Sequence, residues 1–205
     1  PAAKTPGKMT PHRRRELADT TSATIAELSG GKKNAEAQLD DFVASASANV
    51  QFTKSKQFLN EGAGIFSKAP AKNKKAREMA ELQYETTQQT LKAAGYTEPV
   101  TLYRGISEGQ AAGKNGRIQY WSDDPSLAAV FAGQNGTVYA AKVPPSAVLY
   151  TSFTAKASSR VMDNVLRNSG GSIDANEWAV FDEHVTDFSI HGPGVKPPQG
   201  LSAED

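Results

Sequence analysis

The spacing of apolar side chains divides the chain into two parts. Up to about residue 95, apolar residues recur every three or four positions, which is the period of an amphipathic helix. After residue 96, short alternating or wholly apolar runs follow one another, separated by Gly, Pro, Asn and Asp, as is typical of strands joined by turns. We therefore predict an α+β fold in which a helical region precedes a sheet.

Three helices are predicted in the first part, at residues 11–28, 34–50 and 74–94. Thr10 and Pro11 make a good start for the first helix, because Thr caps free N–H groups and Pro at the first position forfeits no hydrogen bond. The run Ser29-Gly30-Gly31 ends that helix, and Gly95 ends the third. Residues 62–73 are predicted to form a loop.

The second part contains six candidate strands and few helices. The strands are predicted at residues 100–106, 117–122, 137–143, 147–153, 177–182 and 187–191. One helix is predicted at 125–132 and another around 158–167. So many strands with so few helices favour a mixed or antiparallel sheet over alternating βαβ units.

These patterns give a domain organisation of four parts. Residues 1–15, rich in Pro, Lys and Arg, are predicted to be a disordered basic arm. Residues 16–95 form a helical subdomain and residues 96–192 the sheet domain. The Pro- and Gly-rich residues 193–205 are predicted to be a flexible tail.

Composition excludes several classes of site. The 205 residues contain no cysteine, which removes disulfides and thiolate–metal sites. The three histidines, His12, His184 and His191, are scattered, so we predict no metal site. No apolar run approaches the roughly 18 residues needed to span a bilayer, so no membrane span is expected.

The net charge of +1 conceals an asymmetry between the two parts. Residues 1–95 carry 15 Lys and Arg against 10 Asp and Glu, whereas residues 96–205 carry 8 against 12. A solvated helical face accounts for the basic charge, since the lysines are interleaved with acidic residues, and the helical part as a whole would pack against the sheet. The alternative is recognition of an acidic partner by Lys72, Lys74, Lys75 and Arg77.

Three polar residues next to predicted strands are candidates for chemistry. Arg104 ends an apolar strand beside Gly105, Ser122 precedes a helix, and Glu177 opens a strongly apolar strand. Each alone has an ordinary explanation: a surface ion pair for the arginine, solvation for the glutamate, and for Ser122 or Asp124 the N-cap of the following helix.

The order of these residues resembles the Arg–Ser–Glu pattern of ADP-ribosyltransferases of the toxin and phage type. The phrasing Tyr84…Thr87-Gln88…Leu91…Gly95…Leu102-Tyr103-Arg104-Gly105 is similar to the entry to that domain, and the helix segment 126–132 resembles the family as well. The resemblance covers roughly residues 80–190. It implies an ADP-ribosyltransferase-like core in residues 96–192.

The resemblance also implies NAD as the substrate, with no metal. Arg104 would hold the diphosphate, since a guanidinium is a planar fork of donors. The Gly105 backbone would meet the nicotinamide amide, and Phe131 would stack on the nicotinamide. Glu177 would stabilise the positive charge that develops on the ribose, and Ser122 would orient Glu177.

The function that follows from the resemblance is mono-ADP-ribosyl transfer from NAD to a macromolecule, a protein or a nucleic acid. The chain would be bacterial or phage-encoded, a toxin, effector or host-takeover protein that acts in a cytoplasm, including that of a host or target cell after delivery. If Glu177 is not the catalytic glutamate, Glu183 is the next candidate.

Two departures from the family pattern leave alternatives open. Arginine-modifying members usually have Glu or Gln two residues before the catalytic glutamate, where this chain has Ala175, with Asp174 and Asn176 one residue out of register. The second and third positions of the family's serine motif are also changed in this chain, to Asp123 and Asp124. An NAD glycohydrolase, with water as acceptor, and a non-catalytic phage or structural binding protein with a degenerate NAD pocket are therefore retained as alternatives.

Overall fold

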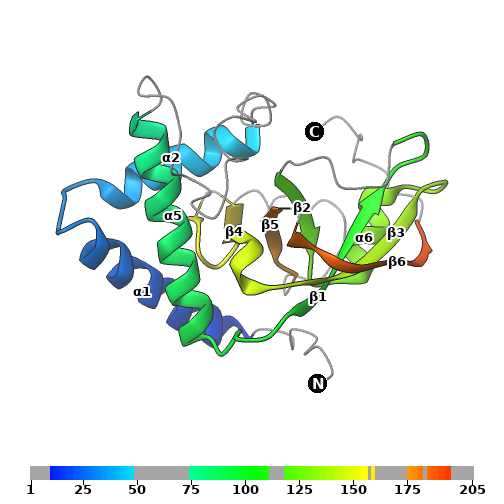
Figure 1. The fold of residues 1–205 in the computed structure, drawn as a ribbon, viewed down its shortest axis with the longest axis horizontal. Coiled ribbons are helices and arrows are strands. Elements are labelled where there is room, and N and C mark those ends of the chain that lie inside the picture. The colour runs from blue at the N-terminus through cyan, green and yellow to red at the C-terminus, as the bar shows by residue number, and fades with distance from the viewer. Residues whose placement is uncertain are drawn as a thin grey trace.

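In the computed structural model, helices precede an antiparallel sheet, as Figure 1 shows. The structure describes residues 10–48, 74–110, 118–156, 158–159, 175–181 and 184–194. The predicted loop at 62–73, most of the predicted helix at 158–167, Lys72, Asp174 and Glu183 lie outside them, as do the side chains of Lys74, Lys75 and Arg77.

The helical part contains α1 (Pro11–Leu28), α2 (Ala35–Ala48) and α5 (Lys74–Ala93). The predicted start of α1 is confirmed: Thr10 Oγ1 accepts a hydrogen bond from Arg13 N at 3.2 Å, and Pro11 occupies the first helical position. The assignment of residues 11–15 to a disordered arm is therefore wrong, because this cap allows the helix to begin at Pro11.

The sheet is built from six strands: β1 (Val100–Ile106), β2 (Ile118–Ser122), β3 (Thr137–Val143), β4 (Val148–Thr151), β5 (Glu177–Phe181) and β6 (Thr186–Pro193). Their order is β4-β5-β2-β1-β3-β6, and every neighbouring pair is antiparallel. The helix α6 (Pro125–Ala132) follows β2, and a 3-10 turn (Pro145–Ala147) precedes β4. The α+β class is confirmed, and the sheet is antiparallel rather than mixed.

The C-terminal end of the sheet runs further than the sequence predicted. Pro193 pairs with Thr137, and Gly194 N donates to Gly136 O at 2.8 Å. The predicted tail therefore does not begin at residue 193, because the edge of β3 supplies backbone partners for these two residues.

Pairing is regular within two strand groups and sparse where they meet. β1 and β3 are in register from Val100↔Val143 to Ile106↔Thr137, and β2 and β5 from Ile118↔Phe181 to Ser122↔Glu177. Between β1 and β2 the register is defined by one pair, Tyr103↔Ser122. The candidate residues lie around this junction.

The helical part and the sheet share an apolar core. Leu17 of α1 and Leu91 of α5 are buried in the same cluster as Leu102, Trp121 and Trp178 of the sheet. α5 lies beside β4, at one end of the sheet, while α6 packs on β1 and β3 (Figure 1). The helical part therefore packs on the sheet, the first of its two predicted roles.

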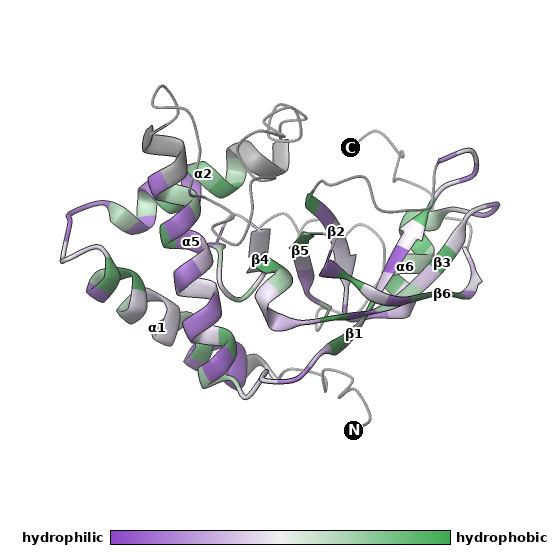
Figure 2. Ribbon diagram, in the orientation of Figure 1, coloured by the Kyte–Doolittle hydropathy of each residue, from purple (hydrophilic) through white to green (hydrophobic). Residues whose placement is uncertain are grey.

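The buried face of α5 is unusually polar. Figure 2 shows hydrophilic residues along much of α5, whereas α6 is largely hydrophobic. Gln83, Thr86, Thr87 and Thr90 are all buried. Gln83 Nε2 donates to Thr154 O at 3.1 Å and to Thr87 Oγ1 at the same distance. Side-chain hydrogen bonds thus fix how α5 docks on the segment that follows β4.

Candidate functional site

Ser122 and Glu177 face each other across the β2–β5 pair. Ser122 is the last residue of β2, Glu177 is the first of β5, and the two are direct cross-strand partners. Such partners point to the same face of a sheet, with Cβ atoms roughly 4.5–5.5 Å apart. The structure therefore brings together two of the three residues predicted from the sequence.

Glu177 is held from the segment that follows β4. Ser158 Oγ donates to Glu177 Oε1 at 2.7 Å. The backbone of Glu177 is fixed by Ser152, whose N–H donates to Glu177 O at 3.0 Å and whose Oγ accepts from Glu177 N at 2.8 Å. Sequence reasoning missed both serines, because nothing in a Ser- and Thr-rich stretch shows that it returns to the start of β5.

The environment of the Glu177 carboxyl changes its acidity. Part of the residue reaches the surface, yet the carboxyl group is closely surrounded, and this burial raises the pKa of Glu177 to about 6, against the opposing hydrogen bond from Ser158. At pH 7 the side chain is therefore mainly ionised, while a modest fall in pH protonates it. An ionised carboxylate in low-dielectric surroundings is suited to stabilising a nearby positive charge.

Ser122 holds the turn between β2 and α6. Its Oγ accepts from Asp124 N at 3.0 Å, and Asp124 Oδ1 in turn accepts from Ser126 N at 2.8 Å. Of the two candidate caps of α6, the structure selects Asp124. Among the described hydrogen bonds, the Glu177 carboxyl is held by Ser158 and not by Ser122, so the role of Ser122 in orienting Glu177 stays a prediction.

Asp123 and Asn176 tie the same ends of β2 and β5 together. Asp123 Oδ1 accepts from Asn176 N at 2.7 Å, and Asp123 Oδ2 accepts from Asn176 Nδ2 at 2.6 Å. Burial raises the pKa of Asp123, while the hydrogen bonds from Asn176 act in the opposite direction. This pair, which the sequence showed only as a departure from a motif, keeps Ser122 and Glu177 in register.

Arg104 lies on the neighbouring strand but not beside these two residues. Since Tyr103 is the partner of Ser122, strand alternation directs Arg104 to the other face at this point. Its Nη1 donates to Oε1 of Gln119, a buried residue of β2 that the sequence did not single out. A diphosphate on Arg104 would share the guanidinium with Gln119.

Gly105 and Phe131 are brought together by α6. A Cβ on Gly105 would lie 2.0 Å from Ala128 O and 3.0 Å from the backbone carbon of Phe131. The glycine is thus required by the close approach of α6, and its predicted contact with nicotinamide would have to use its backbone polar groups. Phe131 is 51% exposed, so its ring is accessible for stacking.

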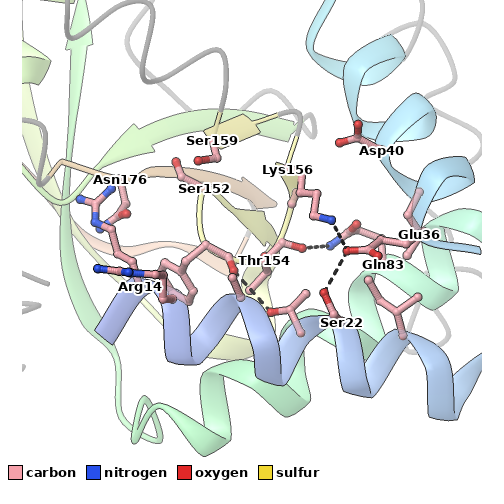
Figure 3. A pocket seen from close by; sticks show the side chains of 17 residues that line it. Arg14, Ser22, Glu36, Asp40, Gln83, Ser152, Thr154, Lys156, Ser159 and Asn176 are labelled. Carbon is pink, nitrogen blue, oxygen red and sulfur yellow. Dashed lines mark hydrogen bonds and ion pairs between the residues drawn. The ribbon is translucent and has the colours of Figure 1, made fainter. Parts of the chain in front are cut away.

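A cavity of about 230 Å³ lies on the helical side of this region, between α1, α2 and the segment after β4 (Figure 3). Ser152 and Asn176, both next to Glu177 in the structure, line it. Arg104, Ser122 and Glu177 are not among its lining residues. The cavity is therefore a neighbour of the candidate site.

Comparisons with protein-family models, with curated proteins and with solved structures found no match. Within the described parts of the chain, no group of three or more His, Cys, Asp and Glu side chains is placed to hold a metal ion. No described helix is long and apolar enough to cross a membrane.

Proposed function

We propose that this chain is a mono-ADP-ribosyltransferase that cleaves NAD at the nicotinamide–ribose bond and transfers ADP-ribose to a macromolecule. The observation that carries the proposal is the Ser122↔Glu177 register on adjacent strands, next to the strand that bears Arg104 and Gly105. The order of these residues along the chain resembles the Arg–Ser–Glu pattern of the family. The fold supports the proposal by pairing Ser122 with Glu177, while Arg104 lies on the adjacent strand and is directed to the other face of the sheet.

The chemistry follows from the surroundings of Glu177. Cleavage of the nicotinamide–ribose bond builds positive charge on the ribose, as in glycoside hydrolysis. A carboxylate fixed by Ser158 and by the two contacts of Ser152 interacts more strongly with that charge than with the neutral ground-state sugar. Arg104 would bind the diphosphate, and Phe131 would cover the nicotinamide released in the reaction.

The structure gives little support for an arginine side chain as the acceptor of ADP-ribose. Ala175 is apolar and 2% exposed, so the usual acceptor-side Glu or Gln has no counterpart there. The amide nitrogen of Asn176 is bound to Asp123 and is not free to replace it. This observation favours an acceptor other than arginine, and it keeps NAD hydrolysis, with water as acceptor, as the second candidate function.

The proposal is tested with NAD labelled on the adenylate side. Wild type and Glu177→Ala are incubated alone and with bacterial or eukaryotic lysates, after circular dichroism has shown that both are folded. We expect wild type to label a discrete macromolecule and Glu177→Ala to be at least about a hundredfold slower, as loss of one preorganised electrostatic group commonly causes. NAD affinity should fall much less, since the charge arises after binding.

The other outcomes separate the alternatives. Free ADP-ribose in every tube, with no labelled macromolecule, would identify a glycohydrolase. Full activity in Glu177→Ala would exclude Glu177 and move the assignment to Glu183. If wild type did not turn over NAD under any condition, the enzymatic proposal would be overturned. The alternative of a non-catalytic binding protein with a degenerate NAD pocket would then be favoured.

A further inference from the structure

The cavity beside the candidate site has an apolar middle and two different polar ends. Ile25, Leu39 and Phe153 contribute to its walls. Figure 3 shows Arg14 and Asn176 at one end and Glu36 with Lys156 at the other. With a volume of about 230 Å³ it is smaller than the roughly 300–1,000 Å³ typical of sites for drug-sized ligands, so its occupant would be a small metabolite.

The Glu36 end is already satisfied. Lys156 Nζ lies 2.6 Å from Glu36 Oε1, and Ser22 Oγ donates to the same oxygen at 2.9 Å. The hydrogen bond from Lys156 lowers the pKa of Glu36, which keeps its carboxyl group ionised. A ligand gains little by inserting a charged group here, so its polar group belongs at the opposite end.

The Arg14 end contains polar atoms that lack partners. Nε and Nη2 of Arg14 are buried with no hydrogen-bond partner among the described residues, and so is Oδ1 of Asn176, a residue that is 1% exposed. An unpaired buried donor or acceptor costs about 1–3 kcal/mol, and more for a charged group. Three such atoms at one end of a cavity indicate a site that is completed by a ligand.

The identity of these atoms specifies the ligand's chemistry. Nε and Nη2 form the side edge of the guanidinium, which donates two parallel hydrogen bonds to the two oxygens of a carboxylate. Asn176 Oδ1 can only accept, so it calls for a donor on the ligand beside the carboxylate, and a neutral O–H avoids placing an ammonium group near the Arg14 guanidinium. Asp123 lies near enough to affect Arg14 electrostatically, but its oxygens are engaged by Asn176.

We propose that this cavity is a binding site for a small 2-hydroxycarboxylate with an apolar body. The carboxylate binds the side edge of Arg14, the hydroxyl donates to Asn176, and the apolar body lies against Phe153 and Ile25. The site is separate from the proposed NAD site and does not depend on the chain being an ADP-ribosyltransferase. It adjoins Glu177 through Ser152 and Asn176.

Three matched probes test the proposal on the whole wild-type chain by isothermal titration calorimetry in the absence of NAD. Mandelate has the carboxylate and the hydroxyl, phenylacetate lacks the hydroxyl, and phenylacetamide lacks the charge as well. We expect affinity to fall in that order, by about fivefold for the hydroxyl and at least about tenfold for the charge. Equal binding of the acid and the amide, or no saturable binding of mandelate at millimolar concentration, would overturn the proposal.

A variant pair locates the binding. Arg14→Lys keeps the charge but removes the two-pronged edge, and mandelate affinity should fall at least about tenfold. Arg13→Lys is the matched control, since Arg13 is on the same helix, exposed and paired with Glu16, and it should leave the affinity within about twofold. Equal affinities of Arg14→Lys and Arg13→Lys would place any mandelate binding outside this cavity and refute the assignment.

Discussion

The β2–β5 strand pair has an apolar part and a polar end that differ in almost every physical respect. In the apolar part, Trp121 is the partner of Trp178, and both side chains are almost completely buried. Trp178 makes edge contacts with Tyr96 and Phe153, at centroid distances of 5.5 and 5.6 Å. One residue further along, Ser122 faces Glu177 and the contacts become hydrogen bonds.

The difference shows how stability and chemistry are divided along a strand pair. The tryptophans stabilise the fold by removing apolar surface from water. The raised pKa of Glu177 shows that burial of its carboxylate costs free energy even with Ser158 as a donor. Glu177 therefore lowers the stability of the fold when it is ionised. Residues with such perturbed pKa values are common at functional sites.

The largest effect is expected in the apolar part. Trp178→Ala should lower the free energy of unfolding by about 3–5 kcal/mol, because it removes a fully buried ring and leaves a cavity. Urea unfolding followed by circular dichroism measures this change. The control is Ile190→Ala on the edge strand β6, where a 71% exposed side chain should matter by less than about 0.5 kcal/mol. If Trp178→Ala lowered the free energy of unfolding as little as Ile190→Ala does, Trp178 would not be a major part of the core.

At the polar end we expect a substitution to raise the free energy of unfolding instead of lowering it. The pKa of Glu177 is raised from 4.5 to about 6 on folding, so the folded state binds this proton more tightly than the unfolded state does. The residue's contribution to stability is therefore greatest when it is protonated and is lost as pH rises from about 4.5 through 6. Glu177→Gln should be more stable than wild type by up to about 2 kcal/mol at pH 7.5.

The comparison is sharpened by repeating the Glu177→Gln measurement at pH 4. There the wild-type side chain is mainly protonated in both states, so the gain should almost vanish, while ionisation of other groups affects both proteins alike. A gain of equal size at both pH values would assign it to packing rather than to charge. A loss at pH 7.5 would mean that the carboxylate is better solvated or better paired than its burial indicates.

The parts of the fold that were predicted from the sequence are those fixed by local rules. The bounds of β1, β3 and α6 follow from alternating apolar residues, from turn residues and, for α6, from Pro125 at its first position. The strand order does not follow from local pattern, because pairing joins segments far apart in the chain. The tail prediction failed for this reason, since the pairing of Pro193 with Thr137 is invisible in composition, whereas the arm was overextended because composition was given more weight than the Thr10 cap.

The candidate site divides in the same way. Arg104, Ser122 and Glu177 could be singled out because each interrupts or borders an apolar run. Their supports could not: Ser158 is 19 positions before Glu177, and Asn176 meets Asp123 across 53 positions. The close approach of α6 to Gly105 could not be predicted either, because the sequence neighbours of the glycine do not show which helix packs against it.

The smallest effect is expected at Ser158, the donor that partly offsets the burial of Glu177. Ser158→Ala removes a 2.7 Å hydrogen bond to the ionised carboxylate, so the pKa of Glu177 should rise further, by about one unit. The acidic limb of kcat/KM for NAD cleavage should move to higher pH by the same amount, with little change above pH 8. A carboxyl NMR titration of Glu177 gives the same information without any assumption about the reaction.

The adjacent serine supplies the control for that experiment. Ser159 lines the cavity instead of contacting Glu177, so Ser159→Ala should leave the titration of Glu177 in place. If both variants shift it equally, the segment as a whole sets the acidity, and the Ser158 hydroxyl has no special part. If only Ser158→Ala does so, a single hydrogen bond tunes the charge at the polar end of β2–β5. In that case we expect Ser158→Ala to have the stability of wild type at pH 4, where the Glu177 carboxyl is mainly protonated and the apolar part of the pair is unchanged.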